Sequence, residues 1–155
     1  AGVLFHFVMG FVLEWQNRKA RPVTYAMYKG SKNSMFVSRN MIISGIVILS
    51  FLVLHFYDFW VPEMDYKYIQ VKPEDPDRYY EELIHKFESP IRVSLYCLSF
   101  IFLGLHLVHG LSSSTQSLGT NNKYASTIQK ISYAFGIGIP LGFCFIALYH
   151  FFIHL

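Results

Sequence analysis

Charged residues are scarce in this sequence, and three long stretches contain none. Only 15% of the 155 residues are Asp, Glu, Lys or Arg, whereas 53% are hydrophobic. The uncharged stretches cover residues 40–57, 93–122 and 131–155. Because a helix needs about 20 apolar residues to cross the hydrocarbon core of a bilayer, each stretch is long enough or nearly so. This composition argues against an ordinary water-soluble domain and favours an integral membrane protein.

Several chemical signatures are missing as well. The two cysteines, Cys97 and Cys144, both lie in uncharged stretches, and no C-x-x-C-H motif occurs. We therefore expect neither a disulfide framework nor covalent attachment of a c-type haem. The sequence has no G-x-S-x-G motif, P-loop or zinc spacing, so it does not indicate a hydrolase. Basic residues are confined to the segments between apolar stretches, which argues against binding to nucleic acid.

The apolar segments predict a single all-α domain, a transmembrane helical bundle. Four spans are visible, at about residues 1–17, 40–60, 91–113 and 131–155. The first of them starts abruptly, without a Met or a basic leader, and has the character of the second half of a longer helix. We therefore expect the native chain to extend further toward its N-terminus.

The loops between the spans differ in charge, and this difference predicts the orientation. Residues 18–39 contain six bases and no acid, whereas residues 61–90 contain eight acids and four bases. Under the positive-inside rule, the basic loop 18–39 and the loop 114–130 lie in the cytoplasm, and the acidic loop 61–90 lies on the periplasmic side. Within the acidic loop, residues 79–87 predict a short surface helix.

Two glycines in the last span have the spacing of a close helix contact. Gly138 and Gly142 are four residues apart, so both lie on the same side of a helix and leave room for a neighbouring backbone. We expect the last span to pack against another helix through this pair.

Histidines are the main functional signal, because six of the seven lie in or beside apolar spans. They are His6, His55, His106, His109, His150 and His154. An imidazole in lipid needs a partner, so each is a functional-site hypothesis by default. The flanking charged and polar residues place His6 and His106 toward the inner half of the bilayer and His55 in the outer half. Two stacked b-type haems require two such levels, because each iron takes two imidazole ligands from facing helices.

A local pattern supports the inner pair. His6-x-x-x-Gly10 and His106-x-x-x-Gly110 each place a glycine one turn from the histidine, which leaves room for a flat macrocycle. Alternatively, both histidines are polar helix contacts beside packing glycines. His109, His150 and His154 have accessory roles open to them: contact with a haem propionate, contact with a quinone, or a place at the interface. Among these, His150 is the best alternative ligand because it also lies toward the outer side.

At these residues the sequence resembles a known family, the cytochrome b membrane-anchor subunit of two-haem succinate dehydrogenases and fumarate reductases, closest to the Bacteroidetes type. The resemblance covers essentially the whole chain, in order. The matching segments are F-H-F-V-M-G-F-V-L-E (5–14), N-R-K-A-R-P (17–22), S-R-N-M (38–41), L-H-F-Y-D-F-W (54–60), L-H-L-V-H-G (105–110), Q-S-L-G (116–119) and A-L-Y-H-F-F (147–152).

The resemblance implies a full-length protein with five spans, of which the chain shows the second to the fifth. The first four spans of the family supply one haem-ligating histidine each. His6 and His106 then resemble the axial ligands of the inner haem. His55 resembles one axial ligand of the outer haem, whose partner would lie on the missing first helix, although depth alone would also permit His150.

Haem carboxylates need cationic or hydroxyl partners near the membrane faces, and four residues are candidates for such propionate or neighbouring contacts. They are Ser38, Arg39, His109 and Gln116. No residues are assigned to a quinone.

The resemblance also implies a role in a larger complex of the bacterial cytoplasmic membrane. The partners would be a flavoprotein subunit with FAD, where succinate and fumarate interconvert, an iron–sulfur subunit and a quinone, usually menaquinone in two-haem members. This chain would carry electrons between the iron–sulfur subunit and quinone through two b haems. It would itself hold no succinate site.

Two alternatives remain open. A haem-free proton or ion carrier would use the histidines as a relay and would need further charged residues inside the spans. Glu14 lies near the end of a span, and the central parts of the spans contain none. A stand-alone di-haem transmembrane reductase would carry the same haems without soluble subunits, and copurification would distinguish it from a complex.

Overall fold

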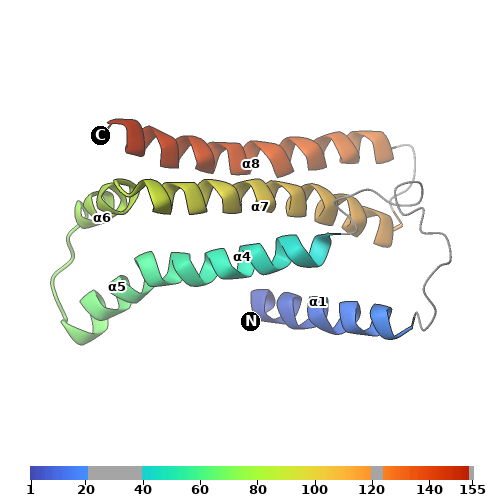
Figure 1. Ribbon diagram of the computed structural model, residues 1–155, viewed down its shortest axis with the longest axis horizontal. Helices are drawn as coiled ribbons and strands as arrows, with labels where there is room; N and C mark the ends of the chain where they lie inside the picture. The colour runs from blue at the N-terminus through green and yellow to red at the C-terminus, as the bar shows by residue number, and fades with distance from the viewer. Residues whose placement is uncertain (21–39, 120–123, 154–155) are drawn as a thin grey trace.

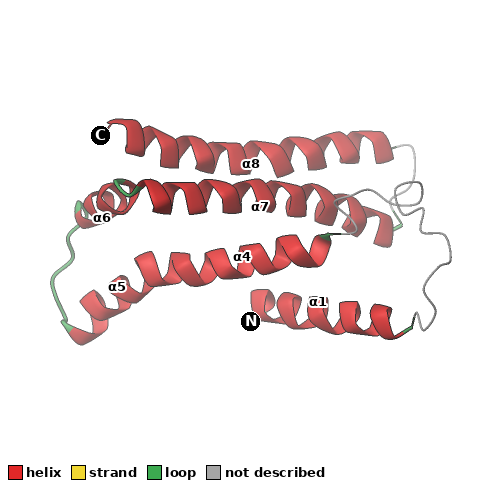
Figure 2. Ribbon diagram, viewed as in Figure 1, coloured by secondary structure: helices red, strands yellow, loops and turns green. Residues whose placement is uncertain are grey.

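The protein is seen here in a computed structural model that describes residues 1–20, 40–119 and 124–153, and every regular element in these ranges is helical (Figure 2). This confirms the all-α prediction for the described ranges. The elements are α1 (Gly2–Lys19), α4 (Met41–His55), η1 (Phe56–Trp60), α5 (Val61–Met64), η2 (Asp65–Ile69), α6 (Arg78–Phe87), α7 (Pro90–Ser117) and α8 (Ala125–Ile153).

The long helices lie side by side in an elongated bundle (Figure 1). The helices α7 and α8 are antiparallel along most of their length, α4 lies beside α7, and the shorter α1 lies beside the first half of α4. The end of α1, the start of α4, the end of α7 and the start of α8 gather at one end of the bundle. The helices α5 and α6 lie at the opposite end (Figure 1).

Three helices are long and apolar enough to cross a membrane, and they correspond to three of the four predicted spans. They cover Met41–Ile69, Pro90–Thr115 and Ala125–Ile153. The helix α1 has 18 residues and carries Glu14, Arg18 and Lys19 in its last turns, and it does not meet the same criterion. The first predicted span is therefore helical, but its crossing of a membrane stays a prediction.

The helix that starts at Met41 continues past the predicted end of its span. It runs to Ile69 through η1, α5 and η2 instead of giving way to a loop after Trp60. Pro62 explains the wider π-helical turn in front of it, because proline has no N–H and its ring would collide with the carbonyl four residues earlier in a regular α-helix. In η1 the N–H of Val61 donates to the carbonyl of Phe56, five residues back.

The short helix α6 confirms the surface helix predicted at 79–87, and contacts with the preceding helix hold it in place. Arg78 forms ion pairs with Glu63 and Glu82, and its Nη1 lies 2.8 Å from Glu82 Oε1. Its guanidinium carbon lies 3.9 Å from the centre of the Tyr66 ring. The Tyr79 hydroxyl donates to Glu63 Oε1 at 3.0 Å. These contacts fix α6 over the α5 end of the bundle.

The closest packing between α7 and α8 occurs at glycines other than the predicted pair. A Cβ added to Gly136 would lie 2.9 Å from Val108 N, and one added to Gly104 would lie 3.2 Å from Gly136 O. Gly138 and Gly142 have no atom of another part of the structure within 4 Å of such a Cβ. The predicted contact at this pair is therefore wrong, because the rotation of α8 turns its Gly136 side toward α7.

The hydrophobic core lies toward the α5–α6 end, where side chains from α6, α7 and α8 meet. Its buried members are Phe87, Val93, Tyr96, Phe100 and Ala147. Elsewhere most large apolar side chains are exposed, and α1 has no buried residue. Apolar exposure of this extent on long helices is consistent with a lipid bilayer as the surrounding medium.

Candidate functional site

His6 and His106, the predicted inner pair, lie next to one another. His6 is on α1 and His106 on α7, and the two rings are brought together across the start of α4. Their centroids are 6.0 Å apart, and their planes stand at 88°. The structure therefore brings together two imidazoles that lie 100 residues apart in the sequence.

This spacing suits two imidazoles that share one metal ion. Two metal–nitrogen bonds of about 2.0–2.1 Å in line, plus the ring radius on each side, span about 6 Å between ring centroids. The described residues contain no group of three or more His, Cys, Asp or Glu that could hold a metal ion. A haem iron needs only two protein ligands, because the macrocycle supplies the other four, so it fits a site of two histidines.

The surroundings of the pair also leave room for a flat group. A Cβ added to Gly10, one turn from His6, would meet no atom within 4 Å. The ring of His106 lies against the backbone of α4, where a Cβ at Gly45 would come 3.8 Å from its Cε1. The glycine one turn from His106 is less open, because a Cβ at Gly110 would touch Met41 Cε at 3.7 Å. Among the described residues, the position beside Gly10 is thus open, and room for a macrocycle there stays a prediction.

Ser44 of α4 contacts Nδ1 of His106, and sequence reasoning missed it. The Ser44 hydroxyl lies 3.0 Å from His106 Nδ1 and donates a hydrogen bond of 2.8 Å to the carbonyl of Met41. Only 5% of Ser44 is exposed. A hydroxyl within an otherwise apolar segment was the available signal, because a buried hydroxyl needs hydrogen-bond partners.

His55, the predicted outer ligand, occupies an aromatic environment at the end of α4. Its ring is stacked on Phe51 at 5.7 Å and lies 5.2 Å from Phe59 and 6.4 Å from Tyr96. Its buried Nδ1 has no hydrogen-bond partner within the described ranges. No second histidine of these ranges is among its ring contacts, so they supply one candidate ligand at this level and a second haem stays a prediction.

A buried carboxylate lies one turn beyond His55, and it too was missed. Asp58 is 1% exposed, accepts a hydrogen bond of 3.1 Å from the Tyr96 hydroxyl, and lies 2.9 Å from Arg92 Nη2. The contact with Arg92 is an ion pair without the alignment of a hydrogen bond. The sequence presented Asp58 only as the polar end of a span. Its burial results from the π-helical turn η1 and from two residues on α7.

The other candidate residues lie apart from these contacts or outside the described part. The ring of His150 packs against Tyr80 of α6 at 5.6 Å and against Tyr149 at 5.3 Å. His109 is partly buried on α7, one turn beyond His106. The described ranges exclude Ser38, Arg39, His154 and the side chain of Gln116.

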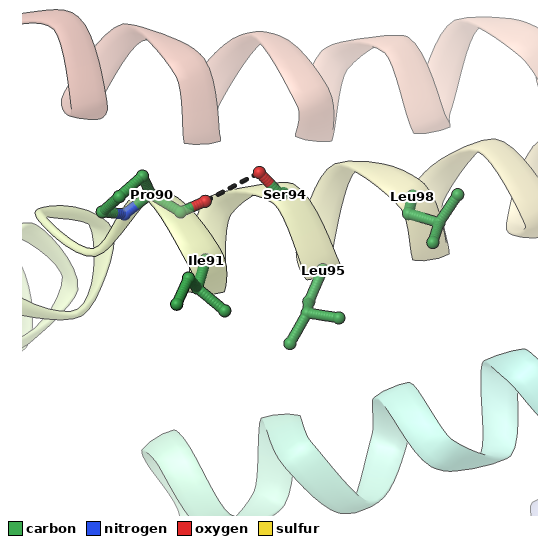
Figure 3. A pocket seen from close by; sticks show the side chains of 5 residues that line it. All are labelled: Pro90, Ile91, Ser94, Leu95 and Leu98. Carbon is green, nitrogen blue, oxygen red and sulfur yellow. Dashed lines mark hydrogen bonds between the residues drawn. The ribbon is translucent and has the colours of Figure 1, made fainter.

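An open groove on the first half of α7 is apolar. It is lined by Pro90, Ile91, Ser94, Leu95 and Leu98 (Figure 3). The Ser94 hydroxyl donates to the Pro90 carbonyl at 2.7 Å (Figure 3). The groove has no titratable side chain, so it offers no ligand to a metal. Its exposed leucines and isoleucine suit contact with lipid.

Comparison with known proteins finds no matching family model, no similar curated protein and no similar solved structure.

Proposed function

We propose that this protein is a helical membrane subunit that binds a b-type haem between His6 and His106 and takes part in electron transfer. The observation that supports this most directly is the pairing of these two imidazoles at 6.0 Å and 88°. Two different helices, α1 and α7, would supply one ligand each, as in haem-binding helical bundles. A b-type haem held there would gain and lose one electron at its iron.

The residues around the pair have three tasks in this proposal. The histidines on α1 and α7 would supply nitrogen ligands to a haem iron. The open position beside Gly10 would leave room for part of the macrocycle. The apolar faces of the surrounding helices would keep water away from the iron, and the low dielectric would help to set its potential.

We further propose that the protein is the membrane anchor of a succinate dehydrogenase or fumarate reductase. This step rests on the sequence resemblance, whose matching segments include those around all three candidate ligands, at 5–14, 54–60 and 105–110. The complex would include a flavoprotein with FAD, an iron–sulfur subunit and menaquinone, and the anchor would hold a second b haem at His55. Arg18 and Lys19, at the end of α1, would lie on the side where the soluble subunits dock.

A haem-free carrier with a histidine relay is the main rival from another class. Its path would need ionisable groups at successive depths. The Asp58–Arg92 pair lies near the outer end, and the described spans bring no carboxylate to the His6–His106 level. A stand-alone di-haem reductase would share the haem sites but lack the soluble partners.

The decisive experiment is a dithionite-reduced minus oxidised spectrum of the full-length protein in its purified complex, with haem quantified per chain. Two b haems per chain are expected. One haem would restrict the proposal to the His6–His106 site, and none in a well-folded preparation would overturn it. Copurification of flavin and iron–sulfur subunits would support the anchor over a stand-alone reductase, and their reproducible absence would contradict it.

A further inference from the structure

The two contacts of Ser44 favour one of the two tautomers of His106. A serine hydroxyl has one hydrogen, and at Ser44 it is donated to the Met41 carbonyl at 2.8 Å. For the contact of 3.0 Å with His106 Nδ1 to be a hydrogen bond as well, the same oxygen accepts and Nδ1 donates. This arrangement places the hydrogen on Nδ1 and leaves the lone pair of the neutral ring on Nε2.

We propose that Ser44 is a positioning residue that fixes the tautomer and the donor strength of His106 as a metal ligand. This inference rests on the proposed function, because it concerns the histidine that would bind the haem iron. Three features make Ser44 suited to the task. It is buried, it is on a different helix from the ring that it orients, and its own rotation is fixed by the Met41 carbonyl.

The physical effect has a definite direction. An imidazole that donates its N–H to an acceptor becomes a more basic ligand, and a more basic ligand favours the ferric over the ferrous ion. The Ser44 contact therefore lowers the midpoint potential of the inner haem. Loss of the hydroxyl should raise that potential.

The test compares Ser44→Ala with Ser50→Ala in the purified complex. Ser50 is on the same helix and donates to the Ile46 carbonyl at 3.0 Å, but it is exposed and contacts no histidine. We expect Ser44→Ala to increase the ferrous-to-ferric ratio at a fixed potential about three- to tenfold. A tenfold change corresponds to about 59 mV for a one-electron couple. Ser50→Ala should leave the ratio and the haem spectrum unchanged.

Two further variants keep the test informative if Ser44→Ala loses its haem or does not assemble. Ser44→Thr retains the hydroxyl and should restore the wild-type potential. Ser44→Cys has nearly the same shape but is a weaker acceptor, so its potential should lie above that of wild type.

The outcomes separate this inference from the proposed function. Wild-type protein without haem would overturn the proposed function. If the wild-type protein binds haem and the midpoint potential is the same in wild type, Ser44→Ala and Ser44→Cys, only the role of Ser44 is overturned. If Ser44→Ala does not assemble, the role of Ser44 is overturned when the midpoint potential is the same in Ser44→Cys, Ser44→Thr and wild type.

Discussion

Asp58 and Arg92 form an ion pair between the first long helix and the start of α7, with Oδ1 and Nη2 2.9 Å apart. The Asp58 side chain is fully buried, and that of Arg92 is 28% exposed. The other carboxylate oxygen accepts the Tyr96 hydroxyl at 3.1 Å. A charge taken out of solvent in this way is tolerated only with its partners, so this pair couples the two helices more strongly than surface ion pairs do.

Replacement of Asp58 should therefore destabilise the bundle. We expect Asp58→Ala to lower the free energy of unfolding by about 2–4 kcal/mol, somewhat less than for a fully buried pair because Arg92 is partly exposed. Tyr96→Phe should cost about 1 kcal/mol through its lost hydrogen bond. The matched control is Glu14→Gln, which breaks an exposed pair with Arg18 and should cost less than about 0.5 kcal/mol. Equal unfolding curves for Asp58→Ala and Glu14→Gln, measured by circular dichroism during SDS titration, would contradict this prediction.

The contact between α7 and α8 predicts opposite effects at two glycines of one helix. A Cβ at Gly136 would lie 2.9 Å from Val108 N and 3.1 Å from Val108 Cα, and this backbone moves only if the helices separate. We expect Gly136→Ala to lower the free energy of unfolding by about 1–3 kcal/mol. Gly138 has open space at its Cβ, so Gly138→Ala should be neutral or stabilising by up to about 1 kcal/mol. The same denaturation assay tests both variants. If Gly138→Ala alone destabilised the protein, Gly138 and not Gly136 would be the glycine of α8 that packs against α7.

The class of fold and the approximate position of the long helices could be predicted because they depend on local composition. Uncharged runs of sufficient length predicted the three apolar helices, but the charged flank after Tyr57 did not mark the end of the first one, which continues to Ile69. The proximity of His6 and His106 was also anticipated, since histidines at matched depth on different spans tend to meet.

Features that depend on helix rotation could not be predicted in this way. The spacing of Gly138 and Gly142 is correct for a close contact, but Gly136 is the glycine that faces α7. In the sequence, Asp58 has the character of a solvated residue at the end of a span. In the structure, the π-helical turn directs its side chain toward Arg92. Such details arise from tertiary packing, which a pattern along one chain does not contain.

Arg78 should control how firmly α6 covers the end of the bundle. It pairs with Glu63 and Glu82 and lies over the Tyr66 ring at 3.9 Å, and only 14% of its side chain is exposed. We expect Arg78→Ala to lower the free energy of local opening of α6 by about 1–2 kcal/mol. This corresponds to roughly 5- to 30-fold faster amide exchange in α6. Hydrogen–deuterium exchange in nanodiscs measures this directly.

The control for the Arg78 experiment is Glu81→Gln. Glu81 is an exposed acid of the same helix. Its exchange rates should match those of wild type. Unchanged exchange in Arg78→Ala would show that the ion pairs do not hold α6.

The charge distribution predicts which end of the bundle faces the cytoplasm. Tyr68, 73% exposed, is near the α6 end, and Leu118, 78% exposed, is at the opposite end. In a background with Cys97→Ala and Cys144→Ala, Tyr68→Cys should react with a membrane-impermeant maleimide on intact spheroplasts. Leu118→Cys should react only after permeabilisation. The reverse pattern would invert the orientation.

Removal of one imidazole of the inner pair gives the most specific prediction about the site. His106→Gly should lose one b haem per chain, because two protein nitrogens on facing helices are required to hold the iron and His6 alone supplies one. Free imidazole should restore that haem, since the deleted side chain leaves a space of the same shape and the rest of the site is unchanged.

Two controls separate loss of a ligand from loss of structure. His85→Ala removes an exposed imidazole that pairs with Glu88 on the surface, and it should retain all the haem. His109→Gln alters a histidine one turn from His106 and should also retain the inner haem if His109 is an accessory residue. Haem content is measured from the reduced-minus-oxidised spectrum before and after addition of imidazole. Full haem content in His106→Gly without imidazole would exclude His106 as an axial ligand, because no glycine can replace the lost nitrogen.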